Sequence, residues 1–99
     1  MIIYEVTAKV GPHIADEYER YMIEQHIPDV LRTGAFTSAN FLMNADGLYQ
    51  ARYAAVDRDA LDRYFEESAD LLRQDVLKRF PQGIEFSRRE WNMIRTWKC

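Results

Sequence analysis

The first ten residues alternate between apolar and polar side chains. The apolar positions are Ile2, Tyr4, Val6, Ala8 and Val10, and the polar positions between them are Glu5, Thr7 and Lys9. A period of two places each set on its own face of an extended chain, which predicts a strand over residues 2–10 with one apolar face. Gly11-Pro12 ends the pattern, because proline has no N–H for the strand ladder.

A helical pattern follows the strand. From about residue 13, apolar side chains recur at steps of three and four, at Ile14, Tyr18, Tyr21 and Met22. Charged residues occupy the positions between them, which is typical of an amphipathic helix that packs on a sheet.

Pro28 predicts where this helix ends. Proline disfavours helical geometry in the residue before it, here Ile27, so we expect the helix to stop or kink around His26. Residues 28–31 then restart as one short turn before Gly34, which is a natural helix terminator.

The second half of the chain repeats the strand and helix signals. Residues 36–43 and 48–56 predict a hairpin joined by Asn44-Ala45-Asp46-Gly47. Asp57 is a plausible N-cap for a helix to about Lys78. The apolar stripe of that helix consists of Leu61, Tyr64, Phe65, Leu72 and Val76. A last strand is predicted from Ile84 to Trp97, bulged or broken near residues 88–90.

The order β-α-β-β-α-β fills residues 1–99 without a linker. It predicts an α+β, ferredoxin-like βαββαβ domain, with a four-stranded antiparallel sheet and two helices on one face. The chain has no third layer for the other face of the sheet. A second copy of the chain would cover it, so we expect a homodimer.

Composition narrows the class of protein. Hydrophobic residues make up 47% of the 99 residues, and the net charge is −3, which disfavours nucleic acid as a partner. No apolar run approaches the roughly 18 residues of a membrane span, and the first residues lack the pattern of a signal peptide. Cys99 is the one cysteine, so the fold needs no oxidising compartment and we expect a cytoplasmic protein without a membrane partner.

Several blocks of the sequence resemble the DUF4286 family of small uncharacterised proteins. They are the opening residues 1–7, the His-Ile-Pro-Asp-Val-Leu block at 26–31, residues 33–39, and Arg79-Phe80. The family is placed among dimeric α/β-barrel proteins, so the resemblance implies a homodimer in which two sheets pack face to face. It implies no established reaction.

The His-x-Pro pattern with a following Gly34 is also similar, more distantly, to EthD-like and muconolactone-isomerase-like proteins. In those enzymes a residue at the mouth of the cavity is thought to assist proton transfer on a phenolic or lactone substrate, which here implies His26. The several-histidine pattern of haem-binding relatives is missing, since His13 is the only other histidine.

His26 supports two interpretations on its own chemistry. An imidazole with an ordinary pKa of about 6.5 suits general base work near neutral pH. In the other interpretation, His26 is a structural residue at a helix end, where it interacts with the helix dipole or fixes the turn before Pro28.

Strand alternation nominates a polar lining for a cavity between two sheets. The candidate ligand-binding residues are Glu5, Thr7, Ser38, Asn40, Gln50 and Arg52. The same side chains would equally form cross-strand salt bridges and hydrogen bonds in a wet dimer interface. A slip of one residue in register would reverse the assignment.

No metal site or cofactor is expected, because two isolated histidines and one cysteine give no recognisable ligand spacing. Two functions stay open. One is a non-catalytic dimer that binds a small apolar or aromatic molecule between its sheets. The other is a cofactor-independent isomerase, decarboxylase or oxygenase-type enzyme, with His26 as the proton-transfer residue and Arg52 or Glu5 orienting a small aromatic or lactone substrate.

Overall fold

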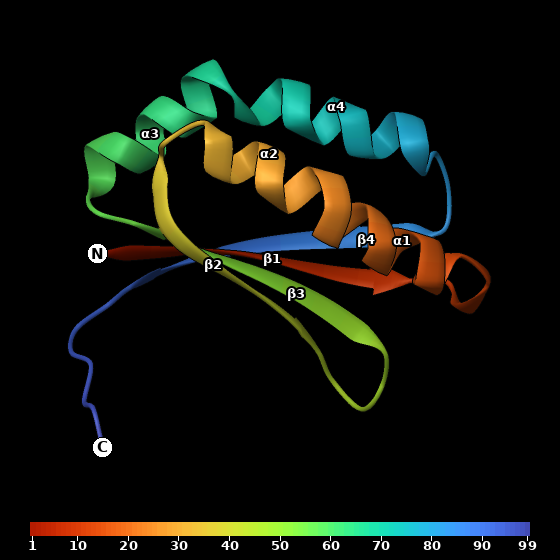
Figure 1. Ribbon diagram of the computed structural model, residues 1–99, viewed down its shortest axis with the longest axis horizontal. Helices are drawn as coiled ribbons and strands as arrows, with labels where there is room; N and C mark the ends of the chain where they lie inside the picture. Colours follow the sequence, from red (N-terminus) through yellow and green to blue (C-terminus); the bar gives the residue numbers. More distant parts are fainter.

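Four antiparallel strands form one sheet in the order β2-β3-β1-β4. The computed structural model describes all residues 1–99. The strands are β1 (Ile2–Val10), β2 (Phe36–Met43), β3 (Leu48–Ala55) and β4 (Ile84–Asn92). The helices all lie on one side of this sheet (Figure 1). The predicted α+β, ferredoxin-like fold is therefore confirmed.

The alternation in β1 decides how the strand is buried. Tyr4 and Ala8 face the helices and are 4% and 1% exposed. They belong to one hydrophobic core with side chains of the helices, such as Tyr18 and Leu61. Because β1 pairs with both β3 and β4, its apolar face forms the centre of the core.

The hairpin between β2 and β3 forms as predicted. The Asn44 side-chain oxygen accepts hydrogen bonds from the N–H groups of Asp46 and Leu48, both at 2.9 Å. Gly47 has a φ of 81°, a left-handed conformation that glycine adopts without a steric penalty. This local turn fixes which residues of the two strands pair.

The first helical stretch does not stop at His26, so that alternative is wrong, and the irregularity at this place is a π turn. The chain stays helical through η1 (Pro12–Ile14), α1 (Ala15–Tyr21), a π-helical turn η2 (Met22–His26) and α2 (Ile27–Arg32). Ile27 keeps a helical φ of −62° and ψ of −44°. A π turn is wider than an α turn, so the carbonyl that would clash with the Pro28 ring is displaced and the helix continues.

The second helical stretch of the chain consists of two helices where the sequence predicts one. They are α3 (Arg58–Glu67) and α4 (Ala69–Arg79), separated by Ser68 with φ −132° and ψ −34°. Serine is a weak helix former. The predicted N-cap is confirmed, because the Asp57 side chain accepts a hydrogen bond from the Ala60 N–H at 2.9 Å.

Strand β4 ends at Asn92, which corrects the predicted end at Trp97. Its pairing with β1 runs without a shift from Ile84 to Asn92, so no bulge occurs at residues 88–90. The Met93 N–H still donates to the Met1 carbonyl at 2.9 Å. Residues 94–99 have no neighbouring strand to bond, and they leave the body of the molecule on the side away from the helices (Figure 1).

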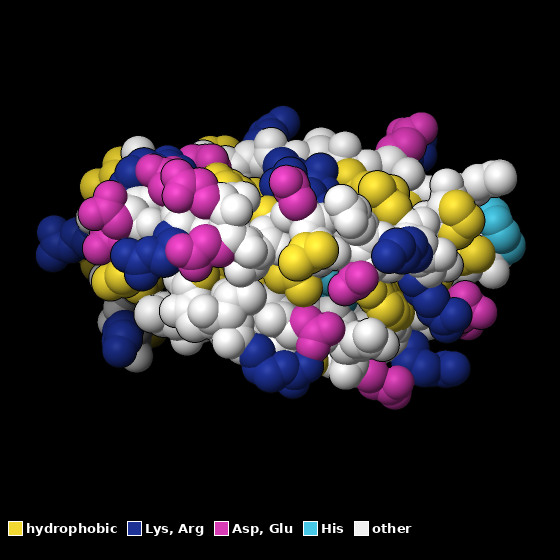
Figure 2. Space-filling view, turned by 90° about the horizontal axis from the view of Figure 1, so that it is seen from above, with side chains coloured by type: hydrophobic (Ala, Val, Ile, Leu, Met, Phe, Trp, Pro, Cys, Tyr) yellow, Lys and Arg dark blue, Asp and Glu magenta, His cyan; other side chains and the backbone are white.

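The outer surface of the helices is charged and mixed. Figure 2 shows basic and acidic side chains interspersed over this face, with small apolar areas between them. None of the helices has the length and apolar character that crossing a membrane requires. The opposite face of the sheet has no helix over it (Figure 1), so the fold offers two different places for a site.

Candidate functional site

A cavity of about 200 Å³ lies between the helices and the sheet. Ten of its thirteen lining residues are hydrophobic, so the walls are mainly apolar. A dry protein cavity of about 150 Å³ is large enough for benzene. This cavity therefore has room for one aromatic ring with substituents.

The π turn places two side chains at the wall of the cavity. Met22 and His26, its first and last residues, both line the cavity. The His26 ring stacks on Tyr21 with 6.1 Å between ring centroids and 25° between planes. His26 thus belongs to a continuous helix and to a cavity wall, and it does not cap a helix end as the structural interpretation assumes.

The His26 ring is half-buried, and neither of its nitrogens has a hydrogen-bond partner in the protein. Every fully buried side-chain nitrogen or oxygen of the protein has a hydrogen-bond partner. The two nitrogens of His26 have none, so both are accessible to solvent. Burial lowers the pKa of His26, and Arg88 lowers it further, while Asp29 and Asp75 oppose the shift. His26 is therefore neutral at pH 7, which leaves one ring nitrogen as a proton acceptor.

Three buried tyrosines complete the polar part of the cavity. Tyr18, Tyr53 and Tyr64 line it and are 2%, 2% and 6% exposed. Their hydroxyls have no partner in the protein and none is sealed off, so each hydroxyl of these cavity-lining residues is accessible. Burial raises the pKa of Tyr18 and Tyr53, and it raises the pKa of Tyr64 to about 12. All three are protonated hydrogen-bond donors at neutral pH.

The sequence pattern assigns Tyr18 and Tyr64 to the apolar faces of helices and Tyr53 to a strand, and it gives none of them a functional role. They are buried as expected, and only their hydroxyls distinguish them from other core residues. Buried tyrosine hydroxyls normally have a hydrogen-bond partner, so three without one mark a place where a ligand would supply the partners. No pattern in the sequence predicts that the three tyrosines lie together, because they come from α1, β3 and α3.

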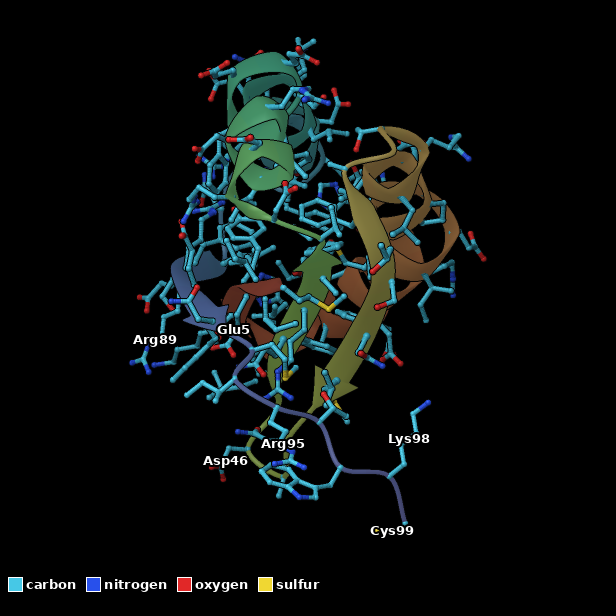
Figure 3. The ribbon with its side chains drawn as sticks, turned by 90° about the vertical axis from the view of Figure 1, so that its left-hand side faces the viewer. Glu5, Asp46, Arg89, Arg95, Lys98 and Cys99 are labelled. Carbon is cyan, nitrogen blue, oxygen red and sulfur yellow. The ribbon has the colours of Figure 1, made fainter.

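The polar residues nominated from the strands lie on the other face of the sheet. Glu5, Ser38, Asn40 and Arg52 line a second hollow of about 480 Å³ there. Figure 3 shows Glu5 on the side away from the helices. Its carboxylate lies 3.6 Å from Arg52 Nε and accepts a hydrogen bond of 3.1 Å from Trp91 Nε1.

Thr7 and Gln50 face the same side but do not line this hollow. They bond each other, with Gln50 Nε2 donating to Thr7 Oγ1 at 3.2 Å. The open face therefore contains cross-strand pairs, and the charged groups of Glu5 and Arg52 already have partners. Salt bridges and hydrogen bonds between neighbouring strands are the contacts that the sequence analysis gave as the alternative to a ligand-binding lining.

The structure separates His26 from Glu5 and Arg52, which corrects the hypothesis that they act together on one substrate. The two hollows share no lining residue. Tyr4 and Val6 line the helix-side cavity, and the residue between them, Glu5, lines the hollow on the opposite face. Alternation along β1 thus puts the thickness of the sheet between His26 and Glu5 within one chain.

The structure contains no cluster of side chains suited to bind a metal ion. No group of three or more His, Cys, Asp or Glu side chains lies close enough to hold a metal ion. The arrangement in the helix-side cavity suits another task, which is to bind an uncharged or anionic ring through donors and one neutral base.

Comparison with known protein families shows to which family the chain belongs. A model of the family described as "Domain of unknown function (DUF4286)" matches residues 1–94. The chain belongs to the DUF4286 family. The resemblance seen in the sequence is thus confirmed, and the family carries no reaction with it. No curated protein matches the DUF4286 chain.

Solved structures share the fold of the DUF4286 chain. A variant of SnoaB from Streptomyces nogalater, described as a cofactor-independent oxygenase, matches with a TM-score of 0.72 at 16% identity, over 96% of this chain and 95% of its own. HapK from Hahella chejuensis matches with 0.70 at 16%, over 100% and 98%. An ethyl tert-butyl ether D (EthD) family protein from Bacillus halodurans matches with 0.65 at 12%, over 95% and 100%. At these identities the likeness shows the fold alone.

Proposed function

We propose that the DUF4286 chain binds a small planar aromatic molecule in the cavity between its helices and its sheet. One observation carries the proposal. A ring-sized apolar cavity is surrounded by His26, Tyr18, Tyr53 and Tyr64, whose polar atoms have no partner in the protein and are not sealed. Because these atoms are accessible from the cavity, a ligand with matching donors and acceptors can form hydrogen bonds with them.

The chemistry of the lining describes the ligand. Protonated tyrosines donate hydrogen bonds to an oxygen substituent, and neutral His26 accepts one from a phenol or enol hydroxyl. The aromatic walls pack against the faces and edges of a ring. A hydroxylated single ring satisfies both parts of the site.

The open face of the sheet competes less well for such a ligand. Its hollow is larger, about 480 Å³, but Glu5 already bonds Arg52 and Trp91. A ligand there would have to replace these contacts. We therefore place the ligand on the helix side, where the polar atoms of His26 and the three tyrosines have no partner in the protein, and assign the open face to a partner subunit.

The binding test compares the two histidines. Thermal-shift and calorimetric titration with phenol and 4-hydroxybenzamide should show binding to the wild type. His26→Gln should weaken it about tenfold, because the hydrogen bond between the imidazole and the ligand is lost. His13→Gln, which changes an exposed histidine outside the cavity, should leave it unchanged. Equal binding to all three proteins would contradict the proposal.

A second candidate function is cofactor-independent catalysis by proton transfer. The observation that favours it is the neutral ring of His26 at the cavity wall. His26 would take a proton from a phenol, enol or activated carbon of the ring, and the tyrosine hydroxyls would stabilise the resulting oxyanion. The description of SnoaB as a cofactor-independent oxygenase supports testing this chemistry.

Proton exchange tests the catalytic candidate without a known product. In D₂O, a bound cyclic ketone or hydroxyquinone should exchange an acidic C–H for deuterium faster with wild-type protein than in buffer. His26→Gln should slow this exchange by roughly 10²-fold or more. If the ligand binds tightly but its exchange is not accelerated, the catalytic function is rejected and the binding function remains.

We further propose that the chain works as a cytoplasmic homodimer joined through the open face of the sheet. Trp91 is 50% exposed on this face, and Ile94 and Trp97 in the segment after β4 are 97% and 74% exposed. Apolar side chains in such a group are typical of an interface between subunits. The single cysteine, Cys99, is exposed and unpaired, which suits a reducing compartment.

A further inference from the structure

We propose that the ligand of this cavity carries an anionic group, and that Arg73 and Arg88 bind that group at the cavity mouth. The ligand class is then an aromatic carboxylate, with the ring inside and the carboxylate towards the surface. This inference rests on the proposed binding function and adds a specificity that the cavity walls alone do not give.

Arg73 reaches the cavity from α4. Its Nη2 donates to the Tyr4 hydroxyl at 3.0 Å, and its guanidinium carbon lies 5.9 Å from the centre of the Phe65 ring. These two contacts hold the side chain in place and engage one of its five N–H donors. The remaining donors are available to a ligand.

Arg88 reaches the same cavity from β4. Its guanidinium carbon lies 5.5 Å from the centre of the Phe86 ring, which is also part of the wall. The side chain is exposed and makes no hydrogen bond to another side chain. Two arginines from separate elements thus line both the cavity and the groove outside it.

Neither arginine is neutralised by a carboxylate. The ion pairs of the chain are Arg32–Asp29, Arg52–Glu5, Arg58–Asp62 and Arg58–Glu90. Glu90 lines the groove outside the cavity, but Arg58 Nη1 holds its carboxylate at 2.7 Å. The mouth therefore carries two positive charges without their counter-charges.

The charge of Arg88 acts inside the cavity. It lowers the pKa of His26, and it opposes the upward shifts of the pKa values of Tyr18 and Tyr64. In each case the positive charge of Arg88 disfavours a further positive charge in the cavity or favours a negative one. An anion of the ligand would gain from the same field.

The two arginines also stand between the cavity and the surface. An outer groove of about 350 Å³ shares Tyr4, Arg73 and Arg88 with the cavity. A ring that enters past these residues would leave a terminal carboxylate beside them. Guanidinium groups match a carboxylate with paired hydrogen bonds, which are stronger than bonds between neutral groups.

The test uses two probes of nearly equal shape, 4-hydroxybenzoate and 4-hydroxybenzamide, in calorimetric titrations at pH 7. Wild-type protein should bind the carboxylate about tenfold more tightly than the amide. Arg88→Gln and Arg73→Gln should each reduce this preference severalfold while binding of the amide changes little. Lys78→Gln, on the same helix as Arg73 and outside the cavity, removes an equal charge and should keep the full preference.

The outcomes separate the two proposals. Equal affinity of wild-type protein for the two probes would overturn the anion site and leave the binding function intact. An unchanged preference in folded Arg88→Gln protein would also overturn it, and because Arg88 is exposed, this variant tests the site even if Arg73→Gln does not fold. Failure of the wild type to bind either probe would overturn both proposals for single-ring ligands.

Discussion

The backbone N–H of Ile27 donates to the carbonyl oxygen of Met22, five residues earlier. This bond defines the π turn that carries the chain past Pro28 without ending the helix. The same turn brings Met22 and His26 to the wall of the helix-side cavity. A backbone irregularity and a candidate site therefore have one cause, which agrees with the frequent occurrence of π turns at functional sites.

Pro28→Ala should separate the effects of the proline on fold and site. Alanine allows an ordinary α turn, so the reason for the π turn disappears and His26 is expected to rotate relative to the cavity. The free energy of unfolding should change by no more than about 1 kcal/mol, whereas ligand affinity should fall. Urea unfolding and calorimetric titration measure the two effects. Unchanged affinity would show that Pro28 does not determine where His26 lies.

The buried position of His26 should make stability depend on pH. Its pKa is lower in the folded protein than the value of about 6.5 in an unfolded chain. Below pH 6.5 the unfolded state therefore binds more protons at this position. The free energy of unfolding should fall as the pH drops from 6.5 through the folded-state pKa, and it should be constant above this window with respect to His26.

Urea unfolding at pH 7.5 and pH 5 checks this linkage. Wild-type protein should lose more stability between the two pH values than His26→Gln protein does. His13→Gln is the matched control, since it removes a histidine that lies outside the cavity. The same acid-induced loss in His26→Gln as in wild type would show that burial of His26 does not carry the effect.

Two leucines of the helix layer should differ sharply in their contribution to stability. Leu61 in α3 is 0% exposed, whereas Leu71 in α4 is 68% exposed. Leu61→Ala should lower the free energy of unfolding by about 2–5 kcal/mol, because it leaves a cavity in the core. Leu71→Ala should change it by no more than about 0.5 kcal/mol. Similar losses measured by urea unfolding would mean that the helix layer packs in another orientation.

Trp91 should be essential for the proposed dimer. Sedimentation equilibrium is expected to show a wild-type dimer at micromolar concentration. Trp91→Ala should weaken dimerisation by about 2 kcal/mol, or roughly 30-fold, as buried tryptophans do at interfaces. Leu71→Ala, on the helix side of the molecule, should leave the dimer intact. A stable wild-type monomer would reject the homodimer.

Much of the fold follows from local patterns. The alternation in β1, the turn at Gly47 and the cap at Asp57 each involve residues close together in the sequence, and each forms as predicted. The end of β4 does not follow from such a pattern, because it depends on where β1 stops offering a partner. The alternating residues beyond Asn92 have the composition of a strand but no neighbour to pair with.

The sequence by itself determined the order of the elements and the face of the sheet that Glu5 and Arg52 occupy, because side chains alternate along a strand whatever it packs against. Only the tertiary structure decided that His26 lies on the opposite side of that sheet, since its direction depends on a π turn and on the layer that covers β1. Arg73 and Tyr4 meet across 69 positions of the sequence. Such contacts depend on how the layers pack, and no local pattern encodes them.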